Sequence, residues 1–304
     1  MRFKLFVFFV LPFWASLSAF SQIEEDSIVW TEQDLMDELE QEERAKSVKK
    51  ADRFVAKAIG KGTKGDLDAA FELLNRAIEL DSANATAYYN RAFAHSLRYE
   101  TRGAIKDYSQ AIRLDSSYVN AYFNRGLSYA DNSDNLNAIA DFTRVIALDS
   151  ANAPAYYYRG VAHYFLIHND SAMADFNRAI ELDSTYSDAY YNRALIRSRS
   201  GDMQGAVADY STAIKFNPFD ADFYNNRGNV QYTLKHYKAA IGDYNKTLYL
   251  DPDIARTYVN RGNAYFMIKD KTSACLDWNK ARSLGFDYTD KDNEFLRRTC
   301  RQMR

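Results

Sequence analysis

The sequence predicts an all-α protein, an α-solenoid of seven helix-turn-helix repeats of 34 residues each, closed by a C-terminal capping helix. Three observations predict this fold. The phrase Ala-Tyr-Tyr-Asn-Arg-Ala at residues 87–92 returns in related form five more times, each 34 residues after the last. A second phrase, Ala-Ile-Lys-Asp-Tyr at residues 104–108, returns in step with it. Only 4 Pro and 12 Gly occur in 304 residues, so few residues interrupt helices.

Residues 1–21 are predicted to form a secretory signal peptide. Arg2 and Lys4 precede a short apolar run, and small residues follow it up to Ser21, after which we predict cleavage. An uncleaved membrane anchor is the alternative, but about 15 apolar residues interrupted by Pro12 fall short of the roughly 20 that span a bilayer as a helix. We therefore expect a secreted or periplasmic chain with no membrane span after cleavage.

Residues 22–50 are predicted to form a flexible leader that is first acidic and then basic. Ten acidic and no basic residues lie between Gln22 and Glu43, and four basic residues follow before position 51. As an alternative, Thr31 with Asp34 is typical of a helix start. A short amphipathic helix would then carry the apolar residues Leu35, Met36 and Leu39.

The seven repeats are predicted to fill residues 51–288. Each unit has two segments of about a dozen residues with apolar spacings of three and four, which is typical of helices. Gly, Asp or Asn near unit position 15 separates them, and Asp-Ser or Asp/Asn-Pro near position 31 closes the unit. The units are residues 51–84, 85–118, 119–152, 153–186, 187–220, 221–254 and 255–288.

Within each predicted hairpin, residues whose unit positions sum to about 31 should lie at the same height on the two antiparallel helices. Position 8, which is Ala or Gly, then faces a large residue at position 24. A helical Gly costs about 1 kcal/mol relative to Ala. Close approach of the two helices is expected to compensate for this cost at Gly126, Gly160, Gly228 and Gly262.

Residues 51–288 resemble the tetratricopeptide repeat family. The shared pattern is the 34-residue period, an aromatic residue at position 4, Gly or Ala at 8, Ala at 20, an aromatic at 24, Ala at 27 and, in two units, Pro at 32. The resemblance implies a right-handed superhelix whose first helices line a concave groove, which in this family commonly holds a peptide or a partner's helix. It implies a mode of action and does not identify a ligand.

Position 7 departs from the family pattern, because Arg stands in six units where Leu is usual, and Asp stands at position 23 of the same units. Since 7 and 23 sum to 30, we predict a structural ladder of ion pairs across the hairpins. The first unit lacks both partners and has Lys57 opposite Leu73. The predicted pairs are Arg91 with Asp107, Arg125 with Asp141, Arg159 with Asp175, Arg193 with Asp209, Arg227 with Asp243, and Arg261 with Asp277.

The remaining stripe of each first helix, at positions 2, 5, 9 and 12, should line the groove. In units two to five it is aromatic and aliphatic, and in unit six it becomes polar. This composition predicts a site for an apolar or aromatic segment of another protein. Packing between neighbouring units is the alternative interpretation. The predicted groove residues are Tyr89, Phe93, Phe123, Leu127, Tyr157, Val161, Tyr191, Leu195, Asn225 and Asn229.

The sequence contains no pattern typical of catalysis or of metal or cofactor binding, so we predict no enzyme, no metal and no cofactor. His95 and His163 occupy the packing position 11, and His168 and His236 lie near turns. Glycine-rich phosphate loops and nucleophile elbows are missing. A net charge of −2 offers no basic field for a nucleic acid.

Residues 289–304 are predicted to form a capping helix over the last repeat. Cys300 lies on this helix, and Cys275 lies on the second helix of the last unit. An oxidising compartment would allow them to pair, as in the similar cysteine-bearing caps of secreted members of the family. A Cys275 to Cys300 disulfide and two free thiols both remain open.

These observations predict a non-catalytic scaffold or adaptor of the cell envelope or exterior. It would bind an extended or helical segment of another protein in its concave groove. An architectural subunit of an envelope or secretion complex, joined through its convex face or its ends, is the alternative. The two differ in size, because an adaptor runs as a monomer or small oligomer whereas a subunit purifies in a stable complex. The sequence predicts neither the partner's identity nor the oligomeric state.

Overall fold

The structure is a computed structural model that describes residues 31–300, and within this range it contains fifteen helices and no strand. The predicted signal peptide, the start of the leader (22–30) and residues 301–304 lie outside the described residues. None of the fifteen helices is both long enough and apolar enough to cross a bilayer. The predicted all-α architecture is therefore confirmed.

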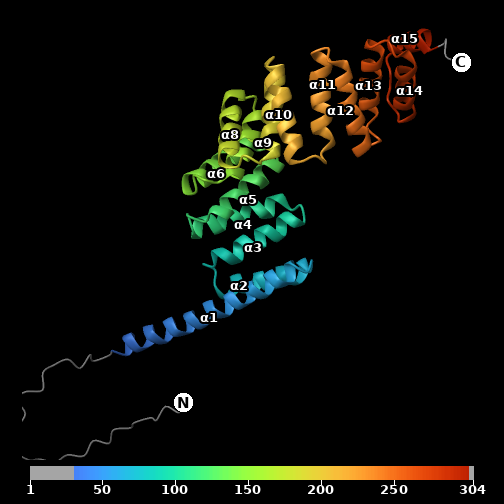
Figure 1. The fold of residues 1–304 in the computed structure, drawn as a ribbon. Helices are drawn as coiled ribbons and strands as arrows, with labels where there is room; N and C mark the ends of the chain where they lie inside the picture. The colour runs from blue at the N-terminus through green and yellow to red at the C-terminus, as the bar shows by residue number, and fades with distance from the viewer. Residues whose placement is uncertain (1–30, 301–304) are drawn as a thin grey trace, which may run out of the picture. The chain divides into compact units, whose positions relative to one another are not determined.

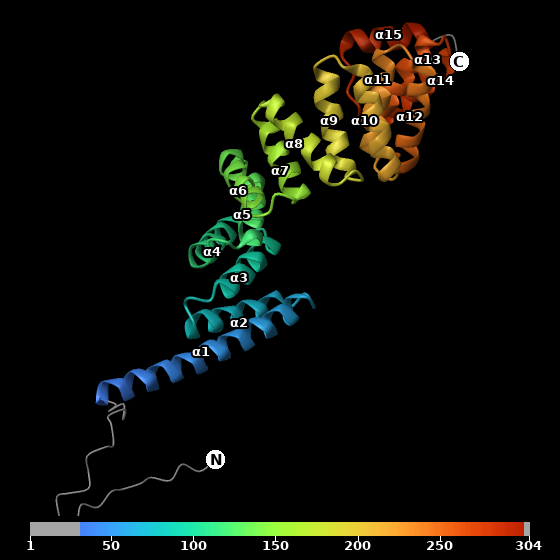
Figure 2. The same ribbon diagram turned by 60° about the vertical axis from the view of Figure 1, so that its left-hand side comes forward.

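The helices alternate as the first and second members of successive hairpins (Figures 1 and 2). The first helices are α1 (Glu32–Gly62), α3 (Ala85–Leu97), α5 (Val119–Asp131), α7 (Ala153–Phe165), α9 (Ser187–Arg199), α11 (Ala221–Thr233) and α13 (Ala255–Met267). The second helices are α2 (Leu67–Leu80), α4 (Thr101–Leu114), α6 (Asn135–Leu148), α8 (Asn169–Leu182), α10 (Met203–Phe216), α12 (Tyr237–Leu250) and α14 (Lys271–Ser283). From α2 to α14, each helix packs against the next one along the chain, so the hairpins stack in sequence order.

Local sequence fixes where the helices begin and end. The side chain of Asn84, for example, caps α3 by accepting a hydrogen bond from the Ala87 amide at 2.9 Å. Each of the seven hairpins then turns at unit position 15 through a residue with positive φ. These turn residues are Gly65, Tyr99, Ser133, Ile167, Gly201, Lys235 and Lys269.

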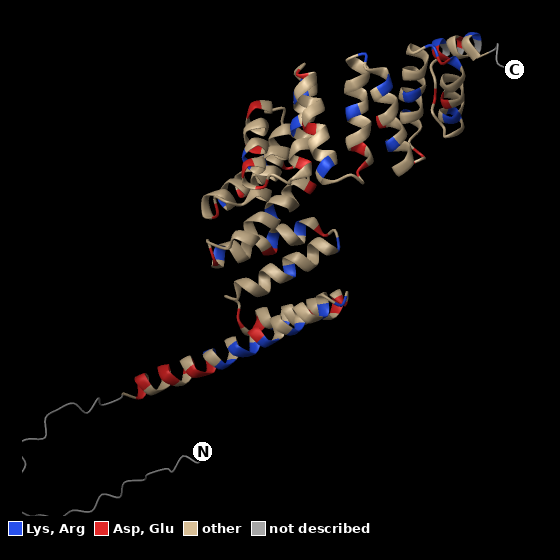
Figure 3. Ribbon diagram, in the orientation of Figure 1, with Lys and Arg blue, Asp and Glu red and all other residues tan. Residues whose placement is uncertain are grey.

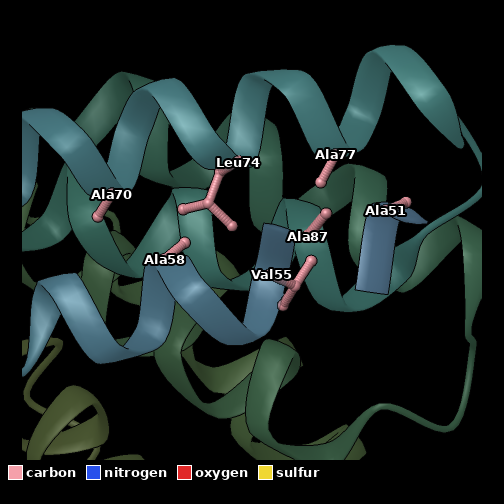
Figure 4. Close-up of a cluster of buried hydrophobic side chains, with 7 residues drawn as sticks. All are labelled: Ala51, Val55, Ala58, Ala70, Leu74, Ala77 and Ala87. Carbon is pink, nitrogen blue, oxygen red and sulfur yellow. The ribbon is translucent and has the colours of Figure 1, made fainter. Parts of the chain in front are cut away.

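The core of each hairpin places large side chains against small ones. In the first hairpin, Figure 4 shows Leu74 of α2 and Val55 of α1 among alanines of α1, α2 and α3. In later hairpins the predicted contact between positions 8 and 24 occurs. A Cβ added at Gly126 would lie 2.9 Å from the buried Phe142 ring, so a side chain larger than glycine's has no room there.

The predicted flexible leader is wrong for residues 32–50, because α1 already begins at Glu32 and continues without interruption into the first repeat. Thr31 and Asp34 cap it reciprocally: the Asp34 amide donates to Thr31 Oγ1 at 3.1 Å, and the Thr31 amide donates to Asp34 at 2.8 Å. No Gly or Pro occurs between residues 32 and 59 to stop the helix. Glu42 and Lys46 form an i,i+4 ion pair at 2.9 Å on it. Among the described residues, those up to Ser47 and those from Val48 onward belong to two separate units.

The last repeat is covered by α15 (Asp290–Cys300). Leu296 is buried against the last hairpin, and the Phe295 ring packs edge-on against Phe266 and Trp278. Cys275 and Cys300 form a disulfide with a Cα to Cα distance of 5.7 Å. A covalent bond and an apolar contact therefore hold the cap on α14.

Candidate protein-binding face

The structure brings together all six of the Arg and Asp pairs. In each, the Arg Nε and Nη2 atoms donate to the two carboxylate oxygens of the Asp at distances of 2.6 to 3.0 Å, a bidentate arrangement. All six Asp side chains are buried. The first unit, with Lys57 and Leu73, has no such pair.

Each ladder arginine also contacts the preceding unit, a contact that was not predicted from the sequence. Its Nη1 atom donates at 2.7 to 3.1 Å to the side chain at position 25 of that unit. A small polar residue occupies this position in every unit, and this regularity in the sequence could have indicated the contact. The acceptors are Asn75, Ser109, Thr143, Asn177, Ser211 and Asn245. The ladder thus joins neighbouring hairpins as well as the two helices of each.

Burial and ion pairing shift the pKa values of Arg91 and Asp141 in opposite directions. The hydrogen bond that Arg91 donates to Asp107 is the main reason that the pKa of Arg91 lies above its ordinary value. Burial raises the pKa of Asp141, although its bond with Arg125 opposes the shift. A buried carboxylate of this kind depends on its arginine to remain charged.

The predicted groove tyrosines at position 5 pack between neighbouring units. The Oη atoms of Tyr89, Tyr157 and Tyr191 each accept a hydrogen bond from the position 6 Asn of the next unit, at 2.9 to 3.1 Å. The Tyr89 ring also stacks on Tyr118 at 4.9 Å, and burial raises the pKa of Tyr191 to about 12. Phe123 packs edge-on against the rings at 142 and 158. The alternative interpretation, packing, therefore describes these four side chains.

More open side chains lie one and two turns further along the first helices. At position 9, Phe93 is 45% exposed, whereas Leu127, Val161 and Leu195 are half-buried. Position 13 was not among the predicted groove positions, and there Leu97 is 48% exposed and Phe165 67% exposed. Because positions 5, 9 and 13 follow one another at i+4, they share one face of each first helix. We call the side chains at positions 9 and 13 the open row.

In units six and seven the same face carries amides. Asn229 Oδ1 accepts from Tyr244 Oη at 2.9 Å and from Asn260 Nδ2 at 3.0 Å, and Asn263 Oδ1 accepts from Trp278 Nε1 at 3.0 Å. The predicted residue Asn225 accepts from Thr257 Oγ1 at 3.1 Å. Asn229, Asn260 and Asn263 line a cavity of about 200 Å³ together with Tyr232, Thr233 and Tyr244. This part of the face is neutral and can donate and accept hydrogen bonds.

A larger cavity, of about 810 Å³, lies against α7, α8 and α9. Tyr164, Met173 and Ile196 are among its lining residues, and Arg199 lies over the Tyr164 ring at 5.1 Å. Ile167 also lines it and is 79% exposed in the turn after α7. Tyr164 and Arg199 belong to the ends of first helices, so this cavity adjoins the open row.

The four histidines lie in or near hairpin turns, and His95 and His236 contact residues of their own turn. His95 lies 2.5 Å from Glu100 in the same hairpin turn, and burial lowers the pKa of His163. His236 lies 2.9 Å from Gln231, and His168 is exposed. Within residues 31–300, no group of three or more His, Cys, Asp or Glu side chains is arranged to hold a metal ion.

Three family models match this chain, and all describe the same repeat. A model described as TPR repeat matches residues 63–97, 100–133 and 199–235, and two described as tetratricopeptide repeat match residues 221–254 and 123–187. Together they cover more than half of the chain. An uncharacterized protein of Methanocaldococcus jannaschii is 39% identical over 56 residues, which are 18% of this chain and 65% of that protein. The chain therefore spans just under two thirds of that relative.

Solved structures share the fold. A tetratricopeptide repeat protein of Parabacteroides merdae is 22% identical with a TM-score of 0.60, and the match covers 83% of this chain and 98% of that one. Pseudomonas aeruginosa PilF is 16% identical with a TM-score of 0.61, covering 71% and 97%. YrrB, described as having an unusual peptide-binding site, is 23% identical with a TM-score of 0.51, covering 60% and 95%.

Proposed function

Because this chain belongs to the tetratricopeptide repeat family, whose members are protein-interaction scaffolds, we propose that it is a non-catalytic scaffold holding a segment of another protein. The segment binds on the open row of the first helices. The peptide-binding site of the similar YrrB supports a peptide as the class of ligand. The segment is extended or helical, since both forms can follow a row of side chains that runs from one helix to the next.

One observation carries this proposal: Phe93 and Leu97 lie one turn apart on α3 and are both about half exposed, while Tyr89 on the same face is packed. Large apolar side chains that stay open beside packed ones are typical of an interaction surface. The exposed Phe165 repeats the pattern two units later.

The chemistry of the face defines the segment. Apolar or aromatic side chains of the partner contact Phe93, Leu97 and Phe165 of the open row, which carries the charged residues Asp131 and Arg199 at position 13 of units three and five. Neutral polar groups, such as backbone carbonyls or amide side chains, contact Asn229 and Asn263 in the last two units, because these amides are uncharged. The site favours a neutral segment over an acidic one there, since Arg227 and Arg261 are already paired with aspartates.

We test the face with the variant Phe93→Ser/Leu97→Ser. As a control, Leu136→Ser removes a leucine of α6 that is 69% exposed and lies outside the first helices. Both variants should keep the wild-type helical circular dichroism. The first should lose the partner that the tagged wild-type chain captures from its own cells, and the second should retain it. Equal capture by both variants rules out the open row.

We also propose that the mature chain works in the periplasm or outside the cell. Residues 1–21 have the pattern of a cleaved signal, and a Cys275 to Cys300 disulfide persists in an oxidising compartment. Cell fractionation and N-terminal sequencing test this proposal. The expected mature protein begins at Gln22 in the periplasmic or secreted fraction. A cytosolic protein with an intact N-terminus contradicts it.

A further inference from the structure

Two side chains, at unit positions 11 and 16, flank each hairpin turn. Acidic and basic residues recur along the array (Figure 3), and in units one, two and five they form a pair across the turn. Attraction between opposite charges holds the two ends of such a turn together. The pairs are Lys61 with Asp66 at 3.0 Å, His95 with Glu100 at 2.5 Å, and Arg197 with Asp202 at 3.7 Å.

Unit four differs from the other units, because both positions are histidine. The rings of His163 and His168 lie 5.7 Å apart across the turn. Nδ1 of His163 is buried and has no hydrogen-bond partner, whereas the equivalent Nδ1 of His95 contacts Glu100. In units three, six and seven at least one of the two residues is Tyr or Gln. Since histidine gains a charge between pH 8 and 5, unit four is the one described hairpin in which acid turns both positions into cations.

The surroundings of the two histidines disfavour these charges. His168 is the N-cap residue of α8 and makes no side-chain cap hydrogen bond, and a cation is unfavourable at the N-terminus of a helix. Burial lowers the pKa of His163, and Arg159 and His168 add to this shift. Asp175 of α8 opposes it, but Asp175 already forms a bidentate pair with Arg159.

The charged groups of the other helices packed near α7 are engaged elsewhere or lie apart from the turn. On α5 and α6, Arg125 and Asp141 pair with each other, Arg144 lies over the Tyr122 ring, and Asp131 is exposed to solvent. On α9, Arg193 and Arg197 pair with Asp209, and Asp188 lies at position 2, far along the helix from position 11. Arg199 of α9 lies over the ring of Tyr164, next to His163 in the chain, and adds positive charge there.

We propose that the turn between α7 and α8 is an acid-sensitive joint in the array. Protonation of His163 and His168 places two cations beside Arg159 and opens this turn, while the other turns stay closed. Ile167, Asn169 and Asp170 of this turn line the cavity of about 810 Å³, so its shape changes with pH. The opening of the turn does not depend on the proposed function.

The pKa of His163 determines the direction of the pH effect. Because the pKa in the closed turn lies below the ordinary value of about 6.5, the open form binds the proton more readily than the closed form. The closed turn is therefore fully stable above about pH 6.5. Its stability falls as the pH drops through this value toward the lowered pKa of the closed form.

Amide hydrogen exchange of the purified protein at about pH 7.5 and about pH 5 tests the proposal. The amides of Ile167 and His168 donate to carbonyls at the end of α7 at 3.0 and 2.9 Å, and those of Tyr99 and Glu100 make the same bonds in unit two at 3.0 Å. After correction for the intrinsic pH dependence of exchange, protection in unit four should fall about tenfold in acid, the effect of one pKa unit. Protection in unit two should not fall.

Two variants exchange the chemistry of the two turns. His168→Glu gives unit four the His and Glu pair of unit two and should abolish the acid effect. Glu100→His gives unit two the His and His pair of unit four and should transfer the effect to its turn. Circular dichroism at both pH values checks that each variant keeps its helices. The proposal is overturned by equal pH dependence of the two wild-type turns, by an acid effect that persists in His168→Glu, or by its absence from unit two of Glu100→His.

Discussion

A single arginine in each of units two to seven contacts three groups at once. Arg159, for example, makes a bidentate pair with Asp175, donates to Thr143 of the preceding unit at 3.1 Å and lies 5.5 Å from the Tyr156 ring centre. A leucine at this position could fill the space but could not make these directional contacts. The arginine therefore fixes both the hairpin and its contact with the neighbour.

Asp175→Ala should cost about 3 kcal/mol of unfolding free energy, near the lower end of the range for breaking a buried pair. The lower end applies because the Arg159 side chain is 20% exposed and can be partly hydrated after the loss. Urea unfolding measures the effect. The Arg178 to Glu181 pair on the same helix is exposed, so Glu181→Ala should cost below about 1 kcal/mol. Equal effects of the two variants contradict a buried ladder.

The Arg and Asp pairing could be predicted because the turn position fixes which residues of a hairpin face each other. The bond from Arg125 to Ser109 could not, since that rule does not describe how one hairpin meets the next. Tyr89 shows the same limit. Its spacing indicated an exposed face, but its hydrogen bond with Asn124 depends on the neighbouring unit.

Within a pair of helices, glycine at position 8 allows the two helices to pack closely. Four hairpins have glycine at position 8, and in each a Cβ would lie within 2.9 Å of the position 24 ring. Helix propensity alone would favour alanine by about 1 kcal/mol at these sites. Because the position 24 ring leaves no room for a Cβ, alanine cannot provide this stabilisation. A glycine at position 8 therefore predicts that the two helices of the hairpin lie close together.

Gly262→Ala should destabilise the protein by about 1 to 3 kcal/mol, because its Cβ would lie 2.7 Å from Trp278 Nε1 and 3.2 Å from the Ala274 carbonyl oxygen. Gly242→Ala is the control, since no atom lies within 4 Å of its added Cβ. This second change should stabilise by up to about 1 kcal/mol. Chemical denaturation compares them, and a shift of both variants in the stabilising direction refutes tight packing at position 8.

The capping helix depends on its disulfide. The Cys275 to Cys300 bond closes a loop with a sequence separation of 25 residues, for which chain entropy gives about 3 to 4 kcal/mol. Reduction should therefore lower the melting temperature and speed amide exchange in α15 and α14. The variant Cys275→Ser/Cys300→Ser should have the melting temperature of the reduced protein, and adding reductant should not change it. An unchanged melting temperature after two free thiols have been counted speaks against this role.

The start of α1 shows what periodicity could not decide. Acidic composition favoured a tether over residues 22–50, whereas the cap formed by Thr31 and Asp34 and the absence of Gly and Pro favoured a helix. Local capping prevailed over composition from Glu32 onward. The acidic composition and the helix cap are both visible in the sequence, but the repeat period does not show which of the two determines the structure.

At the scale of the whole molecule, the part from Val48 onward is a linear array in which each hairpin contacts its neighbours in sequence. Stability in such an array is a sum over units and their interfaces. The ladder and the position 5 tyrosines supply those interfaces, while Phe93, Leu97 and Phe165 at positions 9 and 13 stay exposed. The exposed apolar side chains Phe93, Leu97 and Phe165 lie in units two and four, and the amides of Asn229 and Asn263 lie in units six and seven, so the chemistry of the face differs along the array.

Photo-crosslinking in intact cells tests this division between packing and binding most directly. A photoreactive amino acid replaces Phe93, Leu97 or Leu136 in separate variants, and mass spectrometry identifies the attached peptides. We predict that positions 93 and 97 crosslink to one segment of the same partner protein and that position 136 does not. Crosslinks to that partner from position 136, with none from 93 or 97, would contradict the account.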